Sequence, residues 1–172
     1  DVALRPATRT GYDFEGWYDN AALTGTPVTN LHTMDAENKQ YYAKWSAAKN
    51  YTVQWELNDR APAGHPATNP NTVTSYKVTD PNVTIQPMTW PGYTFDGWYD
   101  NQLFAGTPVT TLVTSAAPAG DKHYYAKWTA KNYNLAYHLN DSATQPANNP
   151  DAGFTTYTAE SPDHAFGTPT RP

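Results

Sequence analysis

Apolar and polar side chains alternate along two corresponding stretches of the chain. In the first, the apolar positions are Tyr51, Val53, Trp55 and Leu57. In the second, they are Tyr133, Leu135, Tyr137 and Leu139. A period of two residues is typical of a β-strand that buries one face. The pattern therefore predicts strands at 51–57 and 133–139, with the intervening polar residues facing solvent.

The stretches GYDFEGWYDN at 11–20 and GYTFDGWYDN at 92–101 alternate as well. A strict period of two places Phe95, Gly97 and Tyr99 on one face and Trp98 on the reverse. The first copy has the same parity, with Phe14, Gly16 and Tyr18 opposite Trp17. A glycine inside a strand predicts that a ring from a neighbouring strand lies across the backbone. The Asp-Asn pairs at 19–20 and 100–101 are expected to end both strands through side-chain turns.

Further elements follow from local composition. YYAKW at 41–45 and 124–128, and the Thr- and Val-rich residues 71–78, predict additional strands. In AGTPVTTL at 105–112, Thr107 can cap a helix and Pro108 suits its first position, so we expect a short helical turn there and in TGTPVTNL at 24–31. Prolines between 78 and 92 predict an extended crossover.

These stretches recur as a whole, which makes the chain a tandem repeat. Residues 11–20 match 92–101 in eight of ten positions, and YYAKW at 41–45 recurs unchanged at 124–128, with nearly the same offset. We therefore predict a later part of one unit at 1–48, a complete unit at 49–130 and an earlier part of another at 131–172. Joints of four or five residues between the last strand of one unit and the first of the next predict a semi-rigid rod.

Composition narrows the class of protein. The 172 residues contain no Cys, 15 Pro and 10 Gly, with 14% aromatic and 16% charged residues. The absence of Cys excludes disulfide scaffolds and thiolate chemistry, and the abundance of Pro and Gly argues against long helices. A net charge of -5 with scattered Lys and Arg argues against a nucleic-acid partner. No apolar run is long enough to enter a membrane directly, so any secretion signal or anchor is expected outside this stretch.

The combination of Y-x-V/L-x-W/Y, a Pro-rich crossover, GYxFxGWYDN and YYAKW resembles the Listeria-Bacteroides repeat, also called the internalin B-repeat. The resemblance covers 51–128 as a whole copy, 1–45 as a later part and 133–172 as an earlier part. It implies a mainly β (α+β) fold of small, tandem ubiquitin-like β-grasp units, each a four-stranded sheet with at most one short helix. Each structural unit corresponds to one copy of the sequence repeat, and in this chain residues 49–130 are such a copy. The departures from the family pattern are a longer hairpin at 58–71 and the added TDPN at 79–82.

The resemblance also implies a function. Such repeats belong to secreted or wall-attached proteins of the bacterial surface and carry no catalytic residues and no cofactor. We expect a stalk or spacer with a possible part in adhesion, whose partners are neighbouring repeats and surface glycans or proteins of the host or of bacteria. The residues expected to build the core of each unit are Gly11, Phe14, Gly16, Tyr42, Trp45, Gly92, Phe95, Gly97, Tyr125 and Trp128.

A carbohydrate-binding module is the alternative. Trp and Tyr rings stack on sugar faces, and nearby carboxylates bind hydroxyl groups. If the face that carries Trp17 and Trp98 is exposed, it forms such a surface. The residues of this surface are Trp17, Tyr18, Asp19, Trp98, Tyr99 and Asp100.

Other chemistry has weaker support. The five His residues, His32, His65, His123, His138 and His164, do not fall at metal-ligand spacing, and no nucleophile elbow is present. We therefore predict neither a metal site nor an enzyme. Lys44, Lys127, Lys49 and Lys131 are expected to be exposed edge charges rather than partners in amide crosslinks.

The two partial units raise the question of self-association. Residues 133–172 supply the early strands of a unit and 1–45 supply the later ones. Together they can complete one unit head to tail between chains, or within one chain if the ends meet. A frame in which 1–81 closes on itself is a further alternative.

Overall fold

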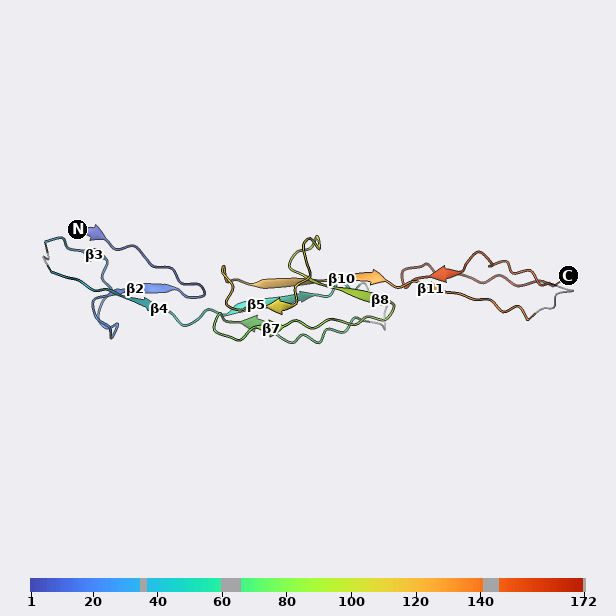
Figure 1. Cartoon of the computed structure of the whole chain (residues 1–172), viewed down its shortest axis with the longest axis horizontal. Helices are drawn as coiled ribbons and strands as arrows, with labels where there is room; N and C mark the ends of the chain where they lie inside the picture. The colour runs from blue at the N-terminus through green and yellow to red at the C-terminus, as the bar shows by residue number, and fades with distance from the viewer. Residues whose placement is uncertain (35–36, 60–65, 141–145, 172) are drawn as a thin grey trace.

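A computed structural model describes residues 1–34, 37–59, 66–140 and 146–171. Figure 1 shows an elongated molecule with the N-terminus near one end and the C-terminus at the other. Every regular element in the described residues is a β-strand, which confirms the mainly β prediction. Among these residues no helix lies across a sheet, so the β-grasp description stays a prediction.

The strands fall into three groups along the rod. The first group contains β1 (Val2–Ala3), β2 (Phe14–Tyr18), β3 (Asn30–Leu31) and β4 (Tyr42–Trp45). The middle group contains β5 (Tyr51–Glu56), β6 (Ser75–Tyr76), β7 (Val83–Thr84), β8 (Tyr93–Tyr99), β9 (Thr111–Leu112) and β10 (Lys122–Ala130). The last contains β11 (Tyr133–Asn134) and β12 (Thr156–Tyr157). All strand pairs join strands of the same group, so the described pairings give no support to a frame that closes 1–81 on itself.

The middle group forms the predicted four-stranded sheet, with the order β6-β5-β10-β8. β10 is antiparallel to β8 and parallel to β5, and β5 is antiparallel to β6. β7 and β9 pair separately. The alternation predicted at 51–57 is confirmed, because Val53 is buried whereas Thr52, Gln54 and Glu56 are exposed.

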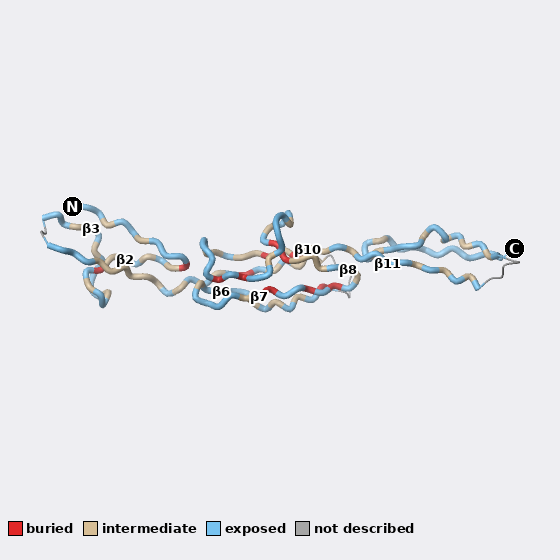
Figure 2. Tube along the Cα trace, in the orientation of Figure 1, coloured by how far each residue is buried: buried red, intermediate tan, exposed pale blue. Residues whose placement is uncertain are grey.

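Most of the buried residues belong to the middle group (Figure 2). They form one core cluster of Val53, Ala67, Tyr76, Ile85, Met88, Trp90, Trp98, Leu112, Tyr124 and Ala126. Trp98 lies at its centre, where its ring meets Trp55 edge to face at 4.9 Å and Phe95 at 5.7 Å. Large aromatic side chains thus supply the core of this small sheet.

The parity predicted for the GYxFxGWYDN strands is wrong, because each strand contains a β-bulge. Trp128 pairs with Phe95 and Lys127 pairs with Gly97, so Asp96 has no partner of its own. In the first group Glu15 is bypassed in the same way, between the pairs of Phe14 and Gly16. One extra residue returns the following side chain to the same face. Trp98 therefore joins Phe95 in the core instead of lying on the reverse face.

The predicted short helices at 24–31 and 105–112 are also absent from the structure. The backbone N–H of Val109 donates to the Trp98 carbonyl at 2.7 Å, and the N–H of Val28 donates to Trp17 in the same way. Pro108 lies against Gly97, with its Cβ 2.6 Å from where a glycine Cβ would stand. The ring across this glycine is thus a proline from the following loop. Because that loop runs back along the strand, it cannot coil into a helix.

Candidate functional site

In the middle group, the proposed sugar-stacking ring Trp98 is inaccessible. Its exposed fraction is 2%, and its indole N–H donates to the Gln86 carbonyl at 3.0 Å. Tyr99, on the other face, is 7% exposed, with Phe104 against its ring edge to face at 5.6 Å. The expectation that Trp98 offers a flat exposed platform is therefore wrong, and the ring has a core role.

In the first group, the corresponding Trp17 is only half-buried. Its indole N–H donates to the Arg5 carbonyl at 2.8 Å, and its ring meets Phe14 edge to face at 5.4 Å. Tyr18 is buried beneath the Lys44 ammonium, which lies 5.5 Å from the ring centroid. The difference between Trp17 and Trp98 arises because, among the described residues, no strand covers Trp17 as β5 covers Trp98.

The polar residues of the motif end the strand, as the sequence predicts. Asn101 donates to the carboxylate of Asp100 at 3.0 Å and to the Ala105 carbonyl at 3.0 Å, and it accepts the Ala105 N–H. Asn20 makes the same bonds with Asp19 and residue 24. Such Asx-type bonds fix a tight turn. Asp19 and Asp100 are thus engaged in turns.

The two joints between groups are built from corresponding residues, and they form the first candidate functional site. The N–H of Lys49 donates to the Gly11 carbonyl at 2.8 Å, and the N–H of Lys131 donates to the Gly92 carbonyl at 2.8 Å. Both glycines have positive φ, 77° and 84°. A Cβ on Gly11 would stand 2.5 Å from the Val78 methyl groups.

The second joint repeats this close approach. A Cβ on Gly92 would stand 2.9 Å from the Cβ of Ala159, the counterpart of Val78. The turn of the following group therefore packs directly on the glycine backbone at both joints. Only a residue without a side chain permits this contact at positive φ.

Side chains reinforce both joints. At the first, Lys49 lies 2.6 Å from Asp13, and this hydrogen bond raises the pKa of Lys49. Both side chains are exposed, which suits an ion pair and not a buried amide crosslink. At the second, Glu160 of the last group lies beside Tyr93 of the middle group, and burial, together with this nearby carboxylate, raises the pKa of Tyr93. Within the middle group, Trp90 stacks on Tyr93 with ring centroids 3.7 Å apart.

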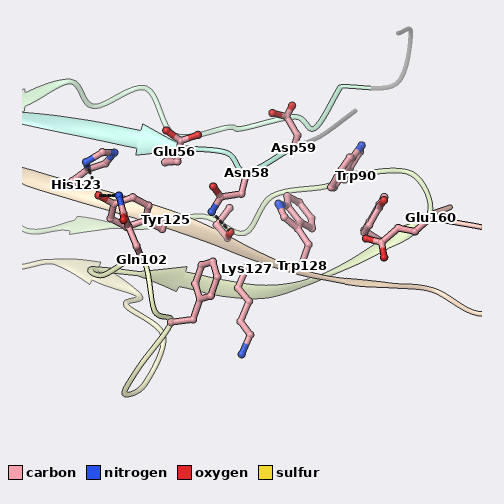
Figure 3. A pocket seen from close by; sticks show the side chains of 13 residues that line it. Glu56, Asn58, Asp59, Trp90, Gln102, His123, Tyr125, Lys127, Trp128 and Glu160 are labelled. Carbon is pink, nitrogen blue, oxygen red and sulfur yellow. Dashed lines mark hydrogen bonds between the residues drawn. The ribbon is translucent and has the colours of Figure 1, made fainter. Parts of the chain in front are cut away.

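A groove along β10 beside the second joint is a second candidate site (Figure 3). Its volume is about 770 Å³, and it is lined by Glu56, Asn58, Asp59, Trp90, Tyr93, Gln102, Phe104, His123, Tyr125, Ala126, Lys127, Trp128 and Glu160. The Tyr125 hydroxyl meets His123 Nδ1 at 2.9 Å, and Gln102 donates to that hydroxyl at 3.4 Å. Figure 3 shows the Lys127 ammonium pointing away from Glu56 and Asp59. The groove therefore combines aromatic rings with amide and carboxylate oxygens.

Sequence reasoning placed Tyr125 and Trp128 in the structural motif but missed the groove. The residues that line it come from four separated parts of the chain, 56–59, 90–104, 123–128 and residue 160, so a single strand pattern cannot reveal it. Burial raises the pKa of Tyr124, on the opposite face of β10, to about 12. Tyr124 therefore belongs to the core and Tyr125 to the groove.

The described residues give no evidence for a metal site or for a membrane-spanning helix. In residues 1–34, 37–59, 66–140 and 146–171, no three His, Cys, Asp or Glu side chains come together as metal ligands. His65 lies outside these residues. The same described parts contain no helix with the length and hydrophobicity to span a bilayer.

Comparison with known proteins gives consistent matches. The family model described as the Listeria-Bacteroides repeat domain matches residues 2–44 and 51–127. Internalin H of Listeria monocytogenes is 34% identical over 131 residues, which cover 74% of this chain and 21% of that protein. A protein of Evansella cellulosilytica named as a membrane protein is 30% identical over 135 residues, covering 78% of this chain and 18% of its own. No solved structure matches. The chain thus spans about a fifth of the length of the curated relatives it matches.

Proposed function

The chain belongs to the Listeria-Bacteroides repeat family, and we propose on that premise that it is a stiff, non-catalytic stalk segment of a bacterial surface protein. The family and the similarity to Internalin H support a repeat of an internalin-like surface protein. In the proposal the segment lies outside the cell and holds other parts of the protein away from the wall or membrane.

The observation that carries the stalk proposal is the repetition of the joint. Gly11 and Gly92 occupy the same place in successive groups, and each accepts a hydrogen bond from the lysine that begins the next group. A joint that repeats its contacts repeats its geometry, so an array of such units extends in one direction. The elongated shape in Figure 1 agrees with this.

Small-angle X-ray scattering tests the stalk. We expect the profile of one elongated particle for the natural chain, and a broader distribution of shapes for Gly11→Ala, because the new Cβ meets the Val78 methyl groups at 2.5 Å. Gly25→Ala is the matched control, since Gly25 also has positive φ, 89°, but nothing lies within 4 Å of its added Cβ. A natural chain that scatters as uncorrelated domains contradicts the proposal.

The groove along β10 favours a second candidate function, the binding of neutral oligosaccharides. Tyr125 and Trp128 offer partly exposed rings, and Asn58 and Gln102 offer amide groups beside them. Aromatic rings and a few placed polar groups are the usual means of binding sugars. The carboxylates of the groove repel anionic glycans, so the expected ligand is neutral.

Titration with a neutral N-acetylglucosamine oligosaccharide tests this second function. We expect shifts of the Trp128 indole signal in a ¹H-¹⁵N spectrum, and a loss of affinity of about two- to tenfold in Tyr125→Ala, since one ring contact is worth roughly 0.5–1.5 kcal/mol. Tyr42→Ala changes the counterpart of Tyr125 outside this groove and should leave affinity unchanged. An unmoved Trp128 signal, or equal binding of polygalacturonate, contradicts the groove as a neutral-sugar site.

A further inference from the structure

The first and last strands of the middle group lie side by side and run in the same direction. β5 begins directly after the first joint, and β10 ends directly before the second. Their parallel pairing runs from Val53 with Lys122 to Glu56 with Tyr125. Figure 1 shows both strands along the length of the rod, between the first and the last group. Tension along the rod therefore pulls the start of β5 and the end of β10 in opposite directions.

The parallel pairing decides how the hydrogen bonds between these two strands carry such a load. When the two strands of a parallel ladder are pulled from opposite ends, they must slide past each other, so all the bonds of the ladder resist together. Two strands that are pulled from the same end peel apart instead, and their bonds break one after another. The arrangement of β5 and β10 between the two joints is of the first kind.

Side-chain hydrogen bonds extend the contact between β5 and β10 beyond the four paired positions. Three such bonds, each 2.8 Å long, run from the Thr52 N–H to the Asp121 carboxylate, from the Asn58 amide to the Ala126 carbonyl and from the Trp128 indole N–H to the Leu57 carbonyl. We call the whole contact, between residues 52–58 and residues 121–128, the seam. Asn58 has φ 51°, an uncommon conformation outside glycine that directs its amide into the seam.

The core protects the seam from water on one face. Val53 of β5 is buried, and so are Tyr124 and Ala126 of β10. Trp55 packs against Tyr124 with ring centroids 5.1 Å apart. Water that reaches a stretched hydrogen bond can replace the partner that is being pulled away, whereas a bond in a water-poor environment is stronger. Burial of these side chains therefore makes the seam harder to break.

We propose that the middle group is a load-bearing unit, in which the seam resists tension along the stalk. This inference rests on the stalk function proposed above and adds a mechanical role to it. A stalk that joins a cell to another surface carries tension whenever the two are drawn apart. Because the resistance depends on the direction of the pull relative to β5 and β10, it is a property separate from the free energy of unfolding.

Pulling the same chain in two directions tests the proposal. The chain contains no Cys, so pairs of introduced thiols can carry the handles of an optical-tweezers experiment. Asn50→Cys with Asn132→Cys applies the pull of the stalk, because these exposed residues flank β5 and β10. Asn50→Cys with Ser115→Cys, also exposed, pulls both strands from the same end. We expect the first pair to unfold the middle group at a force roughly twofold higher or more, since the bonds of the seam then break together.

One hydrogen bond of the seam supplies the second test. Asn58→Gly removes the amide that bonds Ala126, and glycine adopts the positive φ readily. Asn71→Ala is the matched control, because it removes an amide that donates to the Gln86 carbonyl at 2.9 Å, outside the seam. With handles at residues 50 and 132, we expect a lower unfolding force for Asn58→Gly and an unchanged force for Asn71→Ala. In urea, both variants should lose free energy of unfolding.

Equal forces in the two directions of pulling overturn the load-bearing proposal. A fall in force for Asn71→Ala as large as that for Asn58→Gly overturns it as well, because the force would then follow general stability. Both results leave the stalk intact, since small-angle X-ray scattering measures its elongated shape separately. Conversely, a chain that scatters as uncorrelated domains contradicts the stalk, whereas a higher force in the first direction still identifies the seam as the part that resists the pull.

Discussion

Trp98→Ala is expected to destabilise the middle sheet by about 3–5 kcal/mol, which is the usual cost of removing a large aromatic ring from a core. The ring is 2% exposed and contacts Trp55 and Phe95, and its indole N–H holds the Gln86 carbonyl. Its removal leaves a cavity beside Trp55 and Phe95 and takes one of two hydrogen bonds from the Gln86 carbonyl, which keeps the bond from the Asn71 amide. Urea unfolding followed by the indole signals of Trp55 and Trp128 measures the loss.

Trp17→Ala is the matched control, because it removes the same ring from the same motif in the first group. Trp17 is half-buried, so the cost is expected to be smaller and confined to the signals of β2 and β4. If both variants lose the same free energy of unfolding, the inferred difference in burial between Trp17 and Trp98 is contradicted. A fully stable Trp98→Ala contradicts the core role itself.

Sequence reasoning predicted the buried and exposed faces best where residues that alternate with a period of two form a strand without a bulge. The stretch 51–57 has no glycine and no bulge, and its apolar and polar faces lie where the alternation predicts. The offset of the repeat located the two joints at corresponding positions. The mainly β class and the family follow from the same features.

The alternation failed where a bulge interrupts the strand. Counting by two across Asp96 assigns Trp98 to the wrong face, since the count assumes that every residue has a partner. Gly97 was the available signal, because glycine inside a strand marks a bulge as well as a close approach. The prediction of a helix at Thr107 failed for a related reason. Pro108 packs against Gly97, and helix propensity, which depends on neighbouring residues in the sequence, does not reveal that contact.

The joint and the groove depend on contacts between distant parts of the chain. Gly11 meets Val78 although the two residues belong to different groups, and Glu160 reaches the groove from the group after Tyr93. A sequence repeat shows that such positions correspond, but only the fold shows that they touch. The same holds for Trp17, whose exposure is set by which strand lies beside β4.

Gly97→Ala is expected to destabilise the middle sheet by roughly 2–5 kcal/mol, since it combines a strained backbone with overpacking. The residue has φ 131°, a conformation that side chains rarely adopt. The added Cβ would stand 2.6 Å and 2.9 Å from the Cβ and Cγ of Pro108, a rigid ring that cannot turn aside. Relief requires loss of the bulge or displacement of the loop. Either change moves Trp98 relative to Trp55, so the indole signal of Trp98 and the unfolding free energy should change together.

Gly106→Ala separates backbone strain from the contact with Pro108. Gly106 has φ 85°, but nothing lies within 4 Å of an added Cβ, so only the cost of placing a side chain on a left-handed backbone, about 1–2 kcal/mol, is expected. Gly16→Ala should reproduce the Gly97 effect in the first group, where Pro27 Cβ stands 2.7 Å away. If Gly97→Ala costs no more than Gly106→Ala, the proline does not hold the bulge. The bulge would then rest on strand pairing alone, and the burial of Trp98 would need another cause.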